Sequence, residues 1–321
     1  MKKSIFLSFI LCLCLIACIP QQVMAQKQSR MEKLLRYLND NDADKWQKNR
    51  EKLDDETKAY YAEDLSLMDV LNDLWNGQSE QAATLYFGCY EKAAQSNFPG
   101  ICEGEKIPLS QIRDKADQSI INLLEASKDK IPFSRALLDS IHATEYPVDS
   151  AMLQRLQNIR EVALLEGMLK TPTPIIYQTY VKEYPNGKFI AQVNASENVR
   201  LYQLVKTAPT PANFKAFFED PEMQKYYQDR GPRPYLAEVR TLYDDFLFQR
   251  IDSLKKEGNA TAIRQIIDDY KNTPYLSTGA RTHLNDLEYL SEKADFELLK
   301  PAIVNSESLG LLQEFLKNTQ V

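Results

Sequence analysis

The sequence predicts an all-α protein, specifically an α-solenoid of stacked helical hairpins that follows an N-terminal export signal. Apolar residues recur at three- and four-residue steps through most of the chain, and no long run of alternating β-branched residues interrupts them. A short aromatic motif also repeats through the second half. Glycine is scarce, with 10 residues among 321, which argues against a turn-rich β fold and against a glycine-rich phosphate loop.

Residues 1–25 have the segment order of a secretory signal. Lys2 and Lys3 give a basic start, residues 5–19 form an apolar run, and a Val-Met-Ala ending at Ala25 supplies the small residue that signal peptidase prefers. We therefore expect cleavage after Ala25. Removing the two lysines changes the net charge of the chain from −6 to −8.

A lipoprotein signal is the alternative interpretation of the same segment. Residues 15–18, Leu-Ile-Ala-Cys, resemble the lipobox of bacterial lipoproteins, in which the cysteine is lipidated and becomes the first residue. The signal would then cover residues 1–17, and Cys18 would carry a lipid anchor. Either interpretation predicts export, to the periplasm or, with lipidation, to the outer membrane. No other apolar run is long enough to span a bilayer, so membrane contact is expected only through that lipid.

The first part of the mature chain, residues 26–130, is predicted to be a helical region without repeats. The predicted helices of the first half cover residues 32–38, 58–75, 78–94, 110–126, 134–144 and 149–169. Prolines and glycines are concentrated in residues 98–108, which are predicted to form a loop.

Two cysteines, Cys89 and Cys102, lie outside the signal and flank the turn-like residues 97–100. In an oxidising compartment such a pair is compatible with a disulfide. Two separate thiols are equally compatible with the sequence, because spacing alone does not establish the distance between the Cα atoms.

Residues 131–321 are predicted to form helical-hairpin repeats. An aromatic-x-x-aromatic-aliphatic motif starts at residues 177, 214, 263 and 312, and its core positions include Tyr177, Tyr180, Phe214, Phe217, Ile263 and Ile266. Thr173-Pro174 and Thr210-Pro211 open the first two copies, as a threonine N-cap followed by proline in the first turn. Longer amphipathic helices are predicted after the first three motifs, over residues 190–206, 235–256 and 278–299.

Hairpins of this kind bury their apolar stripes by stacking on one another. The aromatic residues are therefore interpreted as core packing rather than as ligand contacts. Residues 309–317 look like the first helix of a hairpin that has no second helix. Its apolar stripe would be covered by the same chain, by a second copy or by a partner.

The best-defined copy resembles the tetratricopeptide-like repeats of Gram-negative envelope proteins, of the BamD type and the Tol-associated periplasmic type. The residues that carry the resemblance are Tyr177-x-x-Tyr180-Val181-x-x-Tyr184-Pro185-Asn186-Gly187-x-Phe189, followed by Ala191 and Ala195. The resemblance implies that the first helix ends at a Tyr-Pro turn, which makes Pro185 part of the repeat core. It also implies that the two alanines allow close packing of the second helix, and that the protein is a binding scaffold without catalytic residues.

Motifs for catalysis, metals and cofactors are not found in the sequence. The chain has two histidines, His142 and His283, and neither is spaced as a metal ligand with a cysteine. Neighbouring carboxylates, such as Asp244 and Asp245, point about 100° apart on a helix and do not form an acid–base pair. We therefore expect no enzymatic activity, no cofactor and no metal site.

Taken together, the sequence favours an exported periplasmic repeat scaffold that binds an envelope protein or peptide, with self-association as a further expectation. The chain has 45 acidic and 39 basic residues, and this acidic balance argues against nucleic-acid binding. One alternative is a lipoprotein subunit of an outer-membrane assembly or transport complex, anchored at Cys18. Another is a helical protein that binds a carbohydrate or other ligand, or a hydrolase without a recognised motif.

Overall fold

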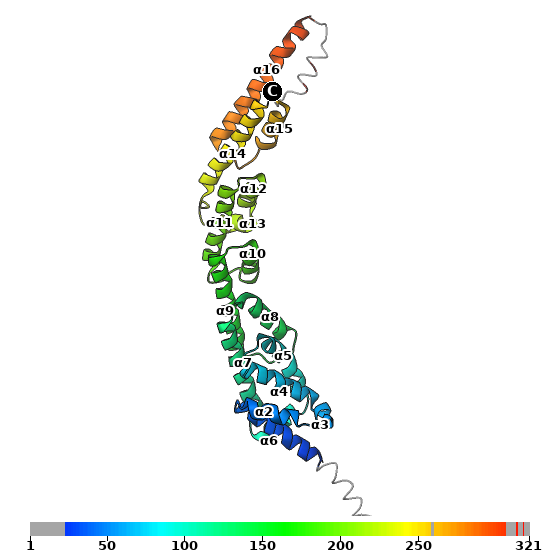
Figure 1. The fold of residues 1–321 in the computed structure, drawn as a ribbon. Coiled ribbons are helices and arrows are strands. Elements are labelled where there is room, and N and C mark those ends of the chain that lie inside the picture. The colour runs from blue at the N-terminus through cyan, green and yellow to red at the C-terminus, as the bar shows by residue number, and fades with distance from the viewer. Residues whose placement is uncertain (1–22, 258–259, 306–312, 314–316, 318–321) are drawn as a thin grey trace, which may run out of the picture. The chain divides into compact units, whose positions relative to one another are not determined.

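The computed structural model describes residues 23–257, 260–305, 313 and 317 (Figure 1). Within these residues the chain is helical apart from short connections and contains no strand, so the predicted all-α class is confirmed for this part of the chain. Cys18 and most of the predicted signal lie outside the described residues. Most of the predicted helix 309–317 lies outside them as well.

Two compact units divide the chain, residues 1–166 and 167–321. The sequence prediction placed the boundary after residue 130. The structure moves it towards the C-terminus because Phe133, Leu137 and Ile141 of α8 join the same buried core as Tyr86 of α5.

The first unit begins with a helix over residues 23–39. Its other helices are α2 (Ala43–Glu51), α3 (Asp55–Tyr60), α4 (Ala62–Trp75), α5 (Glu80–Ala94), α6 (Phe98–Glu105), α7 (Leu109–Ala126), α8 (Lys130–His142) and the first part of α9 (Ser150–Lys170). The centre of the core lies where α4 packs along α5 and where α7 and α8 cover them.

Two predictions for this unit are wrong. Residues 98–108, predicted as a loop, contain helix α6, because Pro99 occupies the first turn, where its missing N–H costs nothing. Asp64 of α4 contributes at the start of that helix: its Oδ2 accepts from Ser96 Oγ at 3.4 Å and from Asn97 Nδ2 at 3.5 Å. Residues 58–75, predicted as one helix, are divided between α3 and α4 at Tyr61.

The second unit contains the remainder of α9 and seven further helices within its described residues. These are α10 (Pro174–Glu183), α11 (Ile190–Thr207), α12 (Pro211–Glu219), α13 (Pro221–Tyr227), α14 (Leu236–Lys256), α15 (Ala260–Tyr270) and α16 (Thr278–Asn305). Short and long helices alternate as predicted, and α10 packs on α11, α14 on α15, and α15 on α16. Helix α13 lies in the insertion between a short and a long helix of the predicted pattern.

The two threonine caps are present. Thr173 Oγ1 accepts from the Ile176 backbone N at 3.3 Å, and Thr210 Oγ1 accepts from Asn213 N at 3.2 Å. Proline follows each threonine in the first helical turn.

We expect Thr210→Ala to lower the free energy of unfolding by about 1 kcal/mol, because one N–H at the start of α12 loses its acceptor. Thr210→Ser keeps that acceptor and should retain most of the stability. Urea unfolding followed by circular dichroism measures both changes. Equal losses in the two variants would contradict a role for the cap.

The aromatic residues of the repeat motif lie in the core of the second unit. Tyr180, Phe214 and Phe217 are fully buried, and Tyr177 is nearly so. Ile266 is buried, whereas Ile263 is half-buried on α15.

Three residues in the best-defined repeat differ from the expectation. Pro185 is exposed, because it follows the C-cap residue Tyr184 and shapes the turn instead of filling the core. Ala191 and Ala195 are also exposed, so they do not bring α11 closer to a neighbour. The packed face of α11 is formed by other residues.

Candidate functional site

A groove of about 550 Å³ lies in the second unit between the short helices α10 and α12. Helix α11 and the start of α13 complete its walls. Its lining residues are Pro174, Tyr177 and Gln178 of α10, Glu197, Arg200 and Leu201 of α11, Ala212, Lys215, Ala216 and Glu219 of α12, and Asp220, Pro221 and Glu222 at the start of α13. The groove therefore combines apolar surface with carboxylates at one side.

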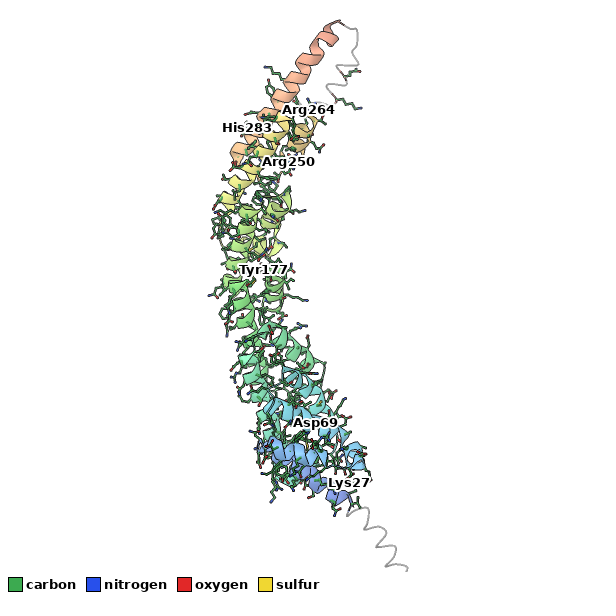
Figure 2. The ribbon with its side chains drawn as sticks, in the orientation of Figure 1. Lys27, Asp69, Tyr177, Arg250, Arg264 and His283 are labelled. Atoms are coloured by element: carbon green, nitrogen blue, oxygen red, sulfur yellow. The ribbon has the colours of Figure 1, made fainter. Side chains whose placement is uncertain are left out.

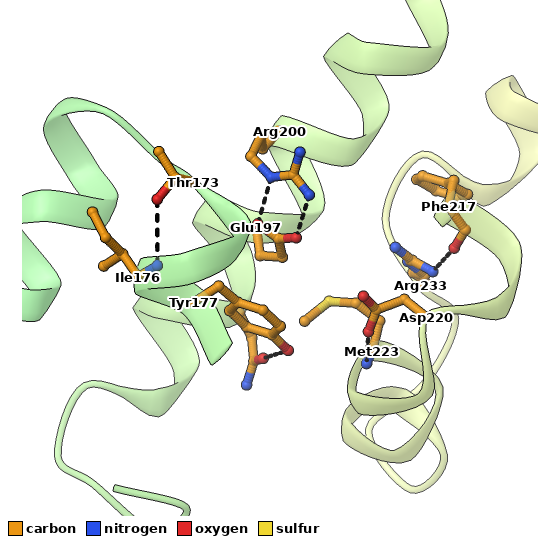
Figure 3. Close-up of polar contacts among 10 residues, drawn as sticks. Thr173, Ile176, Tyr177, Glu197, Arg200, Phe217, Asp220, Met223 and Arg233 are labelled. Atoms are coloured by element: carbon orange, nitrogen blue, oxygen red, sulfur yellow. Dashed lines mark hydrogen bonds and ion pairs between the residues drawn. The ribbon is translucent and has the colours of Figure 1, made fainter. Parts of the chain in front are cut away.

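Polar side chains form the buried face of α11 beside the groove (Figure 3). Tyr177 Oη donates to Asn194 Oδ1 at 2.9 Å, which links α10 to α11. Glu197, which is 2% exposed, accepts two hydrogen bonds from Arg200, at 2.7 Å from Nε and 2.6 Å from Nη2. Each of these buried polar groups is thus paired, as groups removed from water must be. Burial of Tyr177 raises the pKa of its hydroxyl, so it remains a neutral donor at ordinary pH.

Arg233 holds the insertion that contains α13 against the rest of the unit. Its Nε donates to Asn198 Oδ1 at 2.6 Å. Its Nη1 donates to the carbonyl of Phe217 near the end of α12, as Figure 3 shows. The guanidinium carbon lies 3.9 Å from the centre of the Phe217 ring. Burial lowers the pKa of Arg233, while the charge of Asp220 acts in the opposite direction. A cation at the carboxyl end of a helix also interacts favourably with the helix dipole.

Three further features fix the insertion. Gln224 Nε2 donates to the carbonyl of Phe218 at 2.8 Å, and Met223 is fully buried. Asp220 Oδ1 accepts from Met223 N at 2.8 Å and so caps α13. The wall of the groove that α13 provides is therefore ordered before any ligand arrives, which lowers the cost of binding.

Charges on the open side of the groove are partly compensated. Lys215 Nζ lies 3.7 Å from Glu219 Oε2, and the lysine side chain is 70% exposed. Glu197 is neutralised by Arg200. Glu222 is exposed and has neither an ion pair nor a hydrogen bond within the described residues.

A second polar cluster is enclosed in the first unit. Tyr146 Oη donates to Asp117 Oδ1 at 2.5 Å and lies 3.4 Å from Tyr86 Oη. The rings of Tyr86, Phe87 and Tyr90 surround Tyr146 with centroid separations of 4.9–5.6 Å. Burial raises the pKa of Asp117 to about 6, although the hydrogen bond from Tyr146 acts to lower it. No groove reaches this cluster among the described cavities, and we assign it a structural role.

The residues that sequence reasoning examined for chemistry are dispersed in the structure. His142 and His283 are both exposed; His283 lies on α16 with its ring 4.9 Å from that of Phe248 (Figure 2). Within the part of the chain that the structure describes, no three His, Cys, Asp or Glu side chains are grouped as metal ligands. No described helix has the length and apolar character needed to cross a membrane.

Cys89 and Cys102 are free thiols in the structure. Of the two arrangements compatible with the sequence, a disulfide or two separate thiols, the structure contains the separate thiols. Cys89 is half-buried, with its Sγ 3.5 Å from Ser66 Oγ. Burial raises the pKa of Cys102 to about 12, which keeps its sulfur protonated and unreactive.

No family model, curated protein or solved structure matches this chain.

Sequence reasoning missed the polar residues beside the groove. Asn194, Glu197 and Asn198 lie at helical spacing on the stripe that also carries Val193 and Leu201. Polar residues in an otherwise apolar stripe are a signal of buried hydrogen bonds. Arg233 gave no comparable signal, because its partners are distant in the sequence.

Proposed function

We propose that this protein is an exported periplasmic α-solenoid that binds a peptide segment of an envelope protein in the groove between α10 and α12. The observation that carries the proposal is the groove itself, an open cavity between two successive short helices of the repeat pattern. Cavities of this size accommodate small ligands or a few residues of an extended peptide.

The arrangement of the helices supports this interpretation. In repeat proteins each unit packs on its neighbours, and the stacked units create extended concave binding surfaces. Insertions within repeats are often on the binding face. Here the insertion that contains α13 forms one wall of the groove. Export is inferred from the signal-like residues 1–25, as in the sequence analysis.

A display library of random nine-residue peptides tests the proposal. The exported chain, purified from the periplasm of an expression host, is the bait, and Ala216→Trp is the variant that fills the groove. Ala195→Trp is the matched control, because Ala195 is exposed on α11 and does not line the groove.

We expect selected peptides to bind the parent chain and the control alike, and to bind Ala216→Trp at least about tenfold more weakly. Peptides that bind all three proteins equally, or a selection that enriches none, would contradict the groove as the binding site.

A further inference from the structure

We propose that the segment bound in the α10–α12 groove carries a lysine or arginine whose cationic end lies against Asp220 and Glu222. This inference rests on the proposed function and adds the chemistry of the partner. It follows from the charges that remain on the groove after the internal pairs are removed.

After the ion pairs within the groove are counted, the remaining negative charge lies at the junction between α12 and α13. Glu197 is neutralised by Arg200, and Glu219 faces Lys215 on the same helix. Asp220 and Glu222 then remain on the lining, both at the junction between α12 and α13. Asp220 Oδ1 caps α13, whereas Oδ2 accepts no hydrogen bond within the described residues, and Glu222 is unpaired among them.

Arg200 and Arg233 both interact electrostatically with Asp220, but among the described residues neither forms an ion pair with Asp220 or Glu222. Arg233 is 9% exposed, and two of its guanidinium nitrogens bond to Asn198 and to the Phe217 carbonyl. Its charge reduces the negative potential at Asp220, whereas Glu222 is exposed to solvent.

The helix ends at this junction do not favour a cation by themselves, because the carboxyl end of α12 at Glu219 and the amino end of α13 at Pro221 carry partial charges of opposite sign. The preference for a cation follows from the side chains. The apolar part of the groove, with Tyr177, Leu201 and Ala216, matches the aliphatic stem of a long basic side chain. A lysine or arginine therefore satisfies the apolar wall and the acidic junction together, which an acidic side chain does not.

The same peptide selection provides the test. Among peptides whose binding is lost with Ala216→Trp, we expect lysine and arginine to be enriched about threefold over the library. The double variant Asp220→Asn/Glu222→Gln removes the charge and keeps a side-chain cap on α13, because asparagine is a good N-cap. It should weaken binding of these peptides about tenfold and remove most of the salt dependence.

Asp245→Asn/Asp252→Asn is the matched control, since both residues are exposed on α14 and outside the groove lining. It should leave binding unchanged. Groove-dependent peptides that are neutral or acidic, or that bind the Asp220→Asn/Glu222→Gln variant as well as the parent, would overturn this inference and leave the proposed function intact. Absence of any groove-dependent peptide would overturn both.

Discussion

Phe217→Ala should lower the free energy of unfolding of the second unit by about 3–5 kcal/mol, the usual loss when a buried phenylalanine is truncated. Phe217 is fully buried, with its ring edge-on to Phe218 at 5.6 Å between centroids. The guanidinium of Arg233 lies over the Phe217 ring. The truncation therefore leaves a cavity and also removes the aromatic partner of a buried cation.

Hydrogen exchange of peptides from α12 and α14, combined with urea unfolding by circular dichroism, measures this loss locally. Tryptophan fluorescence does not report on the second unit, because both tryptophans, Trp46 and Trp75, precede residue 167. Phe217→Leu retains most of the apolar volume and should cost less than about 1.5 kcal/mol. Ile175→Ala is the surface control, since Ile175 is 76% exposed on α10. A loss below about 1 kcal/mol in Phe217→Ala, with peptide binding abolished, would contradict the interpretation of this aromatic residue as core.

The helices of the second unit were largely predictable because their periodicity, caps and turns are local. Thr173 and Thr210 each act on an N–H three residues away, so adjacent residues contain the whole signal. The start of α14 at Leu236 and of α16 at Thr278 lie within one residue of their predicted positions. Residues adjacent in the sequence were therefore sufficient to predict where these helices begin.

Other features depend on contacts between distant residues. Helix α6 is supported by Asp64, which lies more than thirty positions before its hydrogen-bonding partners Ser96 and Asn97, so a local search sees only prolines and glycines. The groove depends on Arg233 reaching Asn198 and the end of α12. Such tertiary partners override local propensity, and periodicity does not identify them.

The polar face of α11 lies between these two cases. The spacing of Asn194, Glu197 and Asn198 was visible in the sequence, but their burial was not. A polar residue at helical spacing is ordinarily read as part of a solvated face. Their low exposure in the structure, with the hydrogen bonds from Tyr177 to Asn194 and from Arg233 to Asn198 and the ion pair between Glu197 and Arg200, shows that this face points inwards.

Stability of the first unit should depend on pH through Asp117. Burial raises the pKa of this carboxyl from an ordinary value near 3.8 to about 6. A carboxyl with a raised folded-state pKa contributes stability that is fully present below the unfolded value and is lost as the pH rises through the folded value. The stability of the parent chain relative to Asp117→Asn should therefore fall by about 3 kcal/mol between pH 3.5 and pH 7.5, since each pH unit corresponds to about 1.4 kcal/mol.

Urea unfolding followed by tryptophan fluorescence measures this difference, because Trp46 and Trp75 both report on the first unit. Asp129→Asn is the matched control: Asp129 is exposed before α8 and makes no side-chain cap hydrogen bond to it, so its removal should give a nearly pH-independent difference. Tyr146→Phe removes the donor to Asp117, so the charged carboxylate loses its hydrogen bond. That variant should lose more stability at pH 7.5 than at pH 3.5, whereas a loss independent of pH would mean that Asp117 is already neutral across the range.

Because the aromatic rings of Tyr86, Phe87 and Tyr90 exclude water from the carboxyl, the pH dependence follows from packing alone and requires no ligand.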